Sequence, residues 1–298
     1  THIGLESDIA LAKLLKPEWG VDMIIGGHSH SILDKPKKVN NILIAQAGVG
    51  TDQIGRFDIT VDDDTNSIID YQWQLIPIDE ALAKPDKDLE AYINSFKKKV
   101  DRKYSTIITK LATKLTHPKR EVETALGNLI ADAFAESTQT DVMLVGSGSI
   151  RVKAIGPVVT LKDLKTCFPY DDTLSRYTIP GSKLKQIFTH IMRKENRNSE
   201  GECYQVNSKV RAVYDDTQKA IKTLLIDGVP VSETQFYAIC MQGYHFSSCD
   251  RYLNITQDEL LESGKTKVVT TSAYEVLEEY LRNHQNVDSK VEGRLSYS

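Results

Sequence analysis

Two short apolar runs in the sequence each end directly in glycine. Val21–Ile25 is followed by Gly26-Gly27, and Asp141–Val145 is followed by Gly146-Ser147-Gly148-Ser149. Apolar runs of this length, closed by glycine, indicate buried strands. With 298 residues the chain is also long enough for two domains. We therefore expect a mixed α/β (α+β) protein in two units, each containing one of these strands.

The first unit is predicted to alternate helix and strand. Helical spacing runs over Glu6–Leu15, and Ile42–Ala45 is a second apolar strand. Arg56–Val61 and Ser67–Ile78 flank a turn signal and predict paired strands at the edge of a sheet. From 79 to about 115 the pattern changes to an amphipathic helix with a charged outer face, a candidate connector between domains. Its apolar positions lie three or four apart, at Leu89, Ile93, Phe96 and Val100.

The second unit is predicted to begin near His117. Helices are expected over Thr124–Glu136, Leu161–Thr166, Ser182–Arg193 and Ser272–Arg282. Strands are expected over Lys209–Tyr214, Lys222–Ile226 and Gln235–Cys240.

Composition narrows the range of partners. The net charge is -4, so no large basic surface is available for a nucleic-acid polymer or a membrane surface. No run of 18 apolar residues predicts a transmembrane helix. The four cysteines show no metal-binding spacing, and we interpret them as buried thiols, with a Cys240–Cys249 disulfide as the alternative. The chain begins at Thr1 without an initiator Met, which suggests a fragment or a processed form.

Three of the seven histidines lie within the first thirty residues. His28 and His30 follow the Val21–Ile25 strand, and His2 precedes the first predicted helix. Ligands gather at the carboxyl ends of strands in open α/β sheets, and glycines allow the tight turn that brings two imidazoles together. Imidazole suits zinc, iron or manganese. We therefore predict metal ligation by His2, His28 and His30, against the simpler interpretation of solvated or structural histidines.

The segment Thr1–Gly48 as a whole resembles the end of the calcineurin-like metallophosphoesterase domain of 5′-nucleotidases. The matching segments are Thr1-His2-Ile3-Gly4, Val21 to His30 and Gln46-Ala47-Gly48. The resemblance implies two divalent metals, such as zinc or manganese, with His2 and His28 on one metal and His30 on the other. The family's DxH, GDxx and GNHE motifs, which supply a bridging carboxylate and the catalytic histidine, are not in this sequence. We therefore expect no catalytic residue within the chain and only part of the metal site.

The resemblance continues through the second unit. Glu123 to Asp132, Gly146 to Arg151, Phe168 to Asp172 and Tyr237 to Tyr252 resemble four signatures of the family's C-terminal domain, in the same order. A Gly/Ser-rich turn that ends in Arg151 suits a phosphate or a ribose edge, since it offers free backbone N–H groups and a cation. Arg120 adds a second charge, and two tyrosine faces on loops can stack on a base. The resemblance places Tyr170 and Tyr244 on the base, Arg120 and Arg151 on the substrate, and Asp250 near the ribose.

Together these features predict a two-metal phosphohydrolase that converts a nucleotide into a nucleoside and phosphate. Residues 1–80 would be the C-terminal part of an incomplete four-layer metallophosphoesterase sandwich, 81–116 a connector helix and linker, and 117–298 a complete substrate-binding domain. The alternatives are a 2′,3′-cyclic nucleotide phosphodiesterase, a nucleotide-sugar hydrolase, a nucleotide-binding module without turnover, and an adhesin-like surface protein. The expected partners are a small nucleotide and an N-terminal fragment of the same protein. The family resemblance implies an extracellular, periplasmic or cell-surface location.

Overall fold

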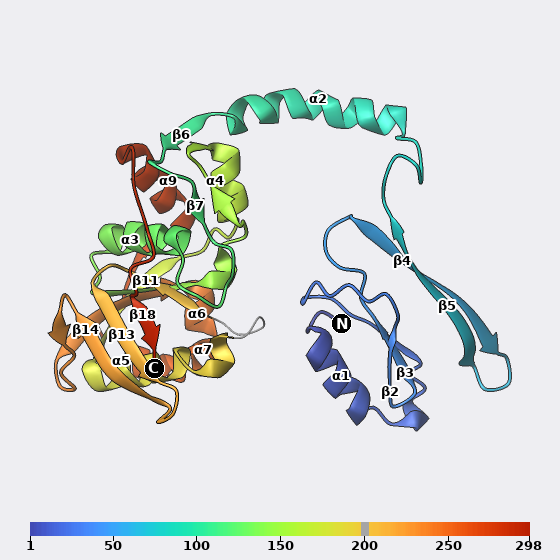
Figure 1. The fold of residues 1–298 in the computed structure, drawn as a ribbon, viewed down its shortest axis with the longest axis horizontal. Helices are drawn as coiled ribbons and strands as arrows, with labels where there is room; N and C mark the ends of the chain where they lie inside the picture. The colour runs from blue at the N-terminus through green and yellow to red at the C-terminus, as the bar shows by residue number, and fades with distance from the viewer. Residues whose placement is uncertain (198–202) are drawn as a thin grey trace. The chain divides into compact units, whose positions relative to one another are not determined.

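The computed structural model describes residues 1–197 and 203–298. The chain divides into two compact units, Thr1–Phe96 and Lys97–Ser298 (Figure 1). Helix α2 (Lys87–Tyr104) contains the point of division. The predicted boundaries at residues 80 and 116 mark family domains, which compactness alone does not define, so they stay predictions.

Unit 1 is built around a small three-stranded sheet in the order β1-β3-β2. Strand β1 (Met23–Ile25) pairs in parallel with β3 (Ile42–Ala45), and β2 (Lys37–Val39) pairs with β3 in the antiparallel sense. Helix α1 (Leu5–Leu14) packs on this sheet through Leu5 and Ala12. A short 3-10 turn, η1 (Pro17–Trp19), joins α1 to β1. The predicted helix and both predicted strands of this region are confirmed.

The remaining part of unit 1 is a long hairpin of β4 (Gln53–Asp62) and β5 (Ser67–Pro77). The Asp62 carboxylate closes its turn by accepting the N–H groups of Asp64 and Thr65 at 2.8 and 3.0 Å. The two strands pair only with each other, so the expected edge of a larger sheet is not formed among the described residues. The Trp73 indole donates to the Leu33 carbonyl at 2.8 Å and anchors the hairpin to the loop after β1.

Helix α2 has the predicted apolar positions on one face, with Tyr92 and Phe96 in edge-to-face contact. Each of these side chains is about half exposed, and none of the helix is buried. The helix and its periodicity are confirmed, but the predicted range of 79 to about 115 is too long, because residues 107–110 form strand β6 and strand β7 begins at Leu115.

Unit 2 has a five-stranded mixed sheet in the order β12-β8-β16-β11-β17. In strand β8 (Val142–Gly146), which lies between β12 and β16, Met143 and Val145 join the core on one face, whereas Val142 and Leu144 join the core on the other. Both faces of the sheet are therefore covered, which explains why this strand is apolar at successive positions instead of alternating. Helices α3, α4 and α9 lie on one side, and α5 with the β13–β14 ribbon lies on the other (Figure 1).

The other elements of unit 2 complete these layers. A second sheet has the order β15-β14-β13-β18, and two short pairs join β6 to β10 and β7 to β9. The helices are α3 (Ala125–Thr138), α4 (Leu161–Cys167), α5 (Gly181–Ile191), α6 (Gly243–Ser247), α7 (Cys249–Leu253), α8 (Gln257–Leu261) and α9 (Ala273–Asn283), with 3-10 turns η2 (Ser147–Ser149) and η3 (Lys194–Arg197). The strands are β6 (Ile107–Lys110), β7 (Leu115–Thr116), β9 (Ala154–Ile155), β10 (Val158–Thr160), β11 (Leu174–Pro180), β12 (Tyr204–Val206), β13 (Val210–Asp215), β14 (Ala220–Ile226), β15 (Val229–Pro230), β16 (Phe236–Gln242), β17 (Lys267–Thr270) and β18 (Leu295–Tyr297).

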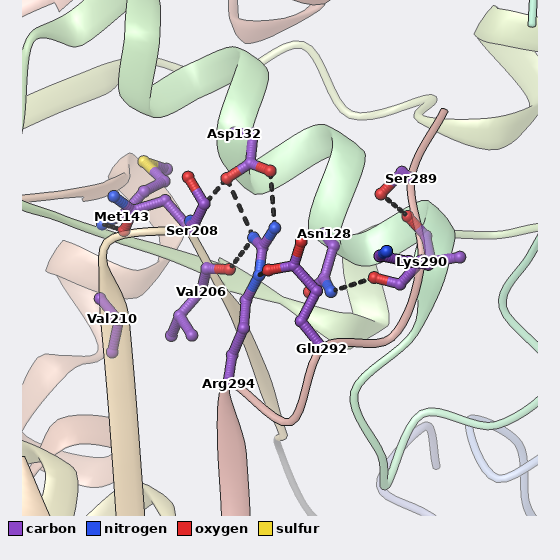
Figure 2. A network of polar contacts seen from close by, with 12 residues as sticks. Asn128, Asp132, Met143, Val206, Ser208, Val210, Ser289, Lys290, Glu292 and Arg294 are labelled. Atoms are coloured by element: carbon purple, nitrogen blue, oxygen red, sulfur yellow. Dashed lines mark hydrogen bonds and ion pairs between the residues drawn. The ribbon is translucent and has the colours of Figure 1, made fainter. Parts of the chain in front are cut away.

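A buried arginine anchors the C-terminal strand β18 to helix α3 (Figure 2). The Arg294 side chain is only 2% exposed, and its guanidinium donates to the Asp132 carboxylate at 2.9 and 2.7 Å. It also donates to the Val206 carbonyl at 2.8 Å and to Glu292 at 3.1 Å. A guanidinium can be buried here because each of its nitrogens has an acceptor.

The cysteine prediction also has a clear outcome. All four cysteines are buried, and Cys167, Cys240 and Cys249 are free thiols. Burial raises the pKa of the Cys240 thiol to about 12. The alternative, a Cys240–Cys249 disulfide, is wrong, because both residues are free thiols.

Candidate functional site

The histidine loop of unit 1 begins where β1 ends. The rings of His2 and His28 lie in edge-to-face contact, with their centroids 5.3 Å apart. Gly27 leaves room for this pair, since a Cβ atom there would lie 3.0 Å from Nδ1 of His2. His28 and His30 both adopt positive φ angles, 72° and 56°, which non-glycine residues seldom do. The structure thus brings His2 and His28 together and puts His30 two residues further along the same tight loop.

A buried carboxylate supports this loop from behind. Asp8 on helix α1 is fully buried, and it accepts the Thr1 hydroxyl at 2.7 Å and the Gln46 amide at 3.2 Å. The Gln46 amide oxygen in turn accepts the Ser29 hydroxyl at 3.1 Å. A Cβ atom at Gly26 would collide with the Asp8 carboxylate. Asp8 and Gln46 are functional residues in the sense that they hold the histidine loop, although the sequence analysis did not predict a role for them.

These imidazoles fit part of a metal site. Two neighbouring neutral imidazoles are suitable ligands for zinc or manganese, but a pair of cations needs carboxylates to hold it together. Within the parts of the chain that the structure describes, 1–197 and 203–298, no three His, Cys, Asp or Glu side chains are arranged to hold a metal ion. The Asp8 carboxylate is already engaged with Thr1 and Gln46.

In unit 2, two exposed arginines project from separate loops. Arg120 lies in the loop between β7 and α3, and Arg151 follows the η2 turn after β8. The Arg151 guanidinium donates to the Gly148 carbonyl at 3.2 Å and lies 5.9 Å from the centre of the Tyr170 ring. The backbone N–H groups of Ser147, Ile150 and Arg151 bind carbonyl oxygens of the protein. The prediction of free N–H groups in this turn is therefore wrong at these three positions.

The two predicted stacking residues are exposed tyrosines on neighbouring segments. Tyr170 is 49% exposed in the loop after α4, and Tyr244 is 56% exposed. Tyr244 lies in the first turn of the short helix α6, not on a loop as predicted. The Asp172 carboxylate joins the two segments, since it accepts the Tyr244 N–H at 2.8 Å and its own neighbour's N–H, that of Thr173, at 2.7 Å. The backbone that carries Tyr244 is thus hydrogen-bonded to a residue two positions after Tyr170.

Tyr244 belongs to an aromatic cluster with His245 and Tyr252. The Tyr244 and Tyr252 hydroxyls lie 3.1 Å apart, and the His245 ring contacts Tyr244 edge to face. His245 is buried with Nδ1 2.8 Å from the Tyr204 hydroxyl, and burial lowers its pKa to about 4. The imidazole is therefore neutral at pH 7, and it packs against the Tyr244 ring from the interior of the protein. The predicted ribose contact, Asp250, has an exposed side chain in the first turn of α7.

Two buried glutamines lie behind the loops and were missed by the sequence analysis. Gln205 on β12 donates to Ser147 of the η2 turn at 2.7 Å, and Gln242 at the end of β16 accepts the Ser149 hydroxyl at 3.0 Å. A signal for them was available: each is a polar residue in an apolar strand, and buried amides require hydrogen-bond partners.

Comparison with known protein families identifies the family of this chain. The family described as "5'-nucleotidase, C-terminal domain" matches residues 106–258, just over half of the chain. The chain therefore belongs to the 5′-nucleotidase family. This assignment confirms the resemblance inferred from the sequence motifs.

Curated relatives and solved structures are consistent with this family assignment. The chain is 26% identical, over 99% of its length, to the trifunctional nucleotide phosphoesterase protein YfkN of Bacillus subtilis, of which it spans only 21%. It is 24% identical, over 99% of its length, to a snake venom 5′-nucleotidase of Macrovipera lebetinus and spans 81% of that protein. The 5′-nucleotidase precursor of Thermus thermophilus superposes with a TM-score of 0.76 at 20% identity, over 99% of this chain and 62% of that one.

The structural match confirms the predicted mixed α/β fold. In the described parts of the chain, no helix is long and apolar enough to cross a membrane.

Proposed function

We propose that unit 2 binds a nucleotide with its base between Tyr170 and Tyr244 and its phosphate or ribose against Arg120 and Arg151. One hydrogen bond supports this proposal most directly. Asp172 lies two residues after Tyr170, and its carboxylate accepts the backbone N–H of Tyr244. Both rings are about half exposed, so a flat ligand that stacked on them would bury apolar surface.

Energetics support a small planar anion as the ligand. Each stacking contact between an aromatic side chain and a base contributes about 1–3 kcal/mol. Arg151, which is beside the Tyr170 ring, adds charge complementarity for a phosphate. Asp250, exposed in the first turn of α7, would accept hydrogen bonds from ribose hydroxyls.

For the hydrolytic reaction, we propose that His2, His28 and His30 are ligands of a divalent two-metal centre. Bound zinc or manganese would supply an activated water and stabilise the charge on the phosphate. In the reaction, water oxygen bonds to phosphorus as the ester P–O bond breaks, and the products are a nucleoside and inorganic phosphate. The carboxylate ligands and the catalytic histidine would come from an N-terminal part of the same protein, so residues 1–298 alone bind nucleotide without efficient turnover.

The substrate is proposed to be a nucleoside 5′-monophosphate. The alternatives are a 2′,3′-cyclic nucleotide or a nucleotide sugar, which would use the same stacking residues. Residues 117–298 would act as the substrate-binding domain and 81–116 as its connector. By analogy with relatives named as venom 5′-nucleotidases, we place the protein outside the cytoplasm, and its detection only in the cytosolic fraction of source cells would contradict that location.

The proposal is tested by measuring binding and turnover on the same preparation. Binding of AMP by calorimetry is expected for the wild type and is expected to weaken at least tenfold in Tyr170→Ala. Tyr92→Ala, which removes an exposed tyrosine from helix α2, is the matched control and should bind normally. Phosphate release from AMP with Mn²⁺ or Zn²⁺ should stay far below a typical enzyme rate of about 10 s⁻¹. Wild-type protein that fails to bind AMP contradicts the binding site, and rapid turnover contradicts the need for further ligands.

A further inference from the structure

One buried side chain connects the loops that carry the two arginines. Gln205 is 1% exposed, and its amide nitrogen donates to the Val122 carbonyl at 2.9 Å and to the Ser147 hydroxyl at 2.7 Å. Its amide oxygen accepts the Thr124 N–H at 2.9 Å. Val122 and Thr124 belong to the loop that carries Arg120, whereas Ser147 begins the turn that leads to Arg151.

The first turn of α3 packs closely against the Gln205 amide. Gly127 in the first turn of α3 faces it, and a Cβ atom at that position would collide with the Gln205 side chain. Thr124, at the N-terminus of the same helix, accepts the Gly127 N–H at 3.0 Å and lies 2.8 Å from Nδ1 of the buried His117. Thr124, which binds Gln205 and belongs to the loop that carries Arg120, is therefore itself fixed by contacts with Gly127 and His117.

The backbones of these loops are connected on the far side of Arg151, since β7 pairs with β9 and the His117 N–H donates to the Lys153 carbonyl at 2.7 Å. Gln205 adds a connection on the near side, because it binds Ser147 at the start of the turn that leads to Arg151. Two guanidinium groups on such loops repel each other when they approach one anion. A rigid connection removes the need to order the loops when the ligand binds, and this preorganisation increases affinity.

We propose that Gln205 is a positioning residue that holds Arg120 and Arg151 in register for the phosphate of the bound nucleotide. This inference rests on the proposed nucleotide site. Gln205 touches no ligand itself and acts through Ser147, Val122 and Thr124.

The test compares an anionic ligand with its neutral counterpart. Gln205→Met keeps the side-chain length and removes every hydrogen bond of the amide. We expect AMP to bind about tenfold more weakly to this variant by calorimetry, while adenosine binds within about twofold of the wild type. The Thr124 amide hydrogen should also exchange faster with solvent. Gln218→Met, an exposed glutamine in the turn after β13, is the matched control and should change neither ligand.

A second variant disturbs the Gln205 amide by changing its neighbour Gly127. Gly127→Ala leaves Gln205 intact but places a methyl group where its amide lies, and it should reproduce the selective loss of AMP binding. This variant also covers the case in which Gln205→Met does not fold.

Three outcomes overturn the inference. Folded variants that bind AMP as the wild type does would show that the connection does not position the arginines, with the proposed function intact. An equal loss for AMP and adenosine would show a merely structural role. A wild-type chain that binds neither ligand would overturn the proposed function, and this inference with it.

Discussion

At the scale of single residues, the exposed side chains are the ones proposed to bind ligands, and the buried polar side chains hold them in place. Arg120, Arg151, Tyr170 and Tyr244 are recognisable from motifs because their chemistry suits a nucleotide. Asp8, Gln46, Gln205 and Gln242 contact only the protein. Their polarity within apolar segments marks Gln205 and Gln242 as residues that need partners, but which backbone groups become those partners depends on the fold.

The buried Arg294 should be among the most sensitive positions of unit 2. Arg294→Met leaves the Asp132 carboxylate without its cation and Glu292 paired only with Arg211, so we expect the free energy of unfolding to fall by about 3 kcal/mol, since both carboxylates stay partly exposed. Urea denaturation measures the change. Arg56→Met, which breaks the exposed pair with Asp58, is the control and should cost less than about 1 kcal/mol. Equal effects at the two positions would contradict the description of Arg294 as the anchor of β18.

His245 should make stability depend on pH in a definite direction. Its pKa is about 4 in the folded protein because of burial, against 6.5 for an ordinary histidine. Between these values the unfolded chain binds the proton and the folded chain does not, so the stabilisation is complete above pH 6.5 and is lost as the pH falls toward 4. The loss is on the order of 3 kcal/mol. The groups around this imidazole are Tyr204, Tyr244, Tyr252 and Asp172.

Denaturation of the wild type and of His245→Gln at pH 7 and at pH 4.5 isolates this contribution. The variant should lose less stability on acidification than the wild type, because glutamine has no proton to gain. Parallel losses in the two proteins would contradict a neutral buried imidazole.

At the scale of secondary-structure elements, periodicity predicted the long helices and the apolar strands well. Residues 125–138, 161–167, 181–191 and 273–283 form helices within two residues of the expected bounds. The five-residue helices α6 and α7 were missed, because one turn and a half of helix contains too few positions to show a period. The two-residue strands β7 and β9 were missed for the same reason.

Helix α3 should depend on its N-terminal threonine more than an ordinary helix does. Thr124 caps α3 and also contacts His117 and Gln205. Thr124→Ala is therefore expected to lower stability by about 2 kcal/mol, the upper end for a cap, and to weaken AMP binding several-fold. Thr160→Ala, which removes the capping box of α4, should cost about 1 kcal/mol and leave AMP binding unchanged. Thermal denaturation and calorimetry on both variants give the comparison, and equal effects on AMP binding would argue against a special role for Thr124.

At the scale of the whole molecule, two units carry two different kinds of site. Glycine-terminated strands predicted both units, and the family motifs predicted which chemistry belongs to each. The sequence could not predict how the fold arranges the candidate binding groups of each unit. The histidine loop supplies imidazoles that Asp8 and Gln46 support, whereas unit 2 carries the tyrosines and arginines that we propose bind the nucleotide.

Because the two proposed sites belong to different units, we expect them to bind their ligands independently. His2→Ala and His28→Ala should weaken Zn²⁺ binding to the chain, and in EDTA they should leave AMP affinity within about twofold of the wild type, because the proposed nucleotide contacts all belong to unit 2. Calorimetry with each ligand in turn makes the comparison. Loss of AMP binding in the histidine variants under these conditions would show that the nucleotide site extends into unit 1.

The most direct test of the central claim is a calorimetric titration of AMP into the wild-type chain and into the Tyr170→Ala/Tyr244→Ala double variant. The account predicts saturable binding of one AMP per wild-type chain and, in the folded double variant, a loss of affinity of about 2–6 kcal/mol from two stacking contacts, which abolishes measurable binding. A double variant that binds AMP as tightly as the wild type would contradict the claim that these two tyrosines form the nucleotide site.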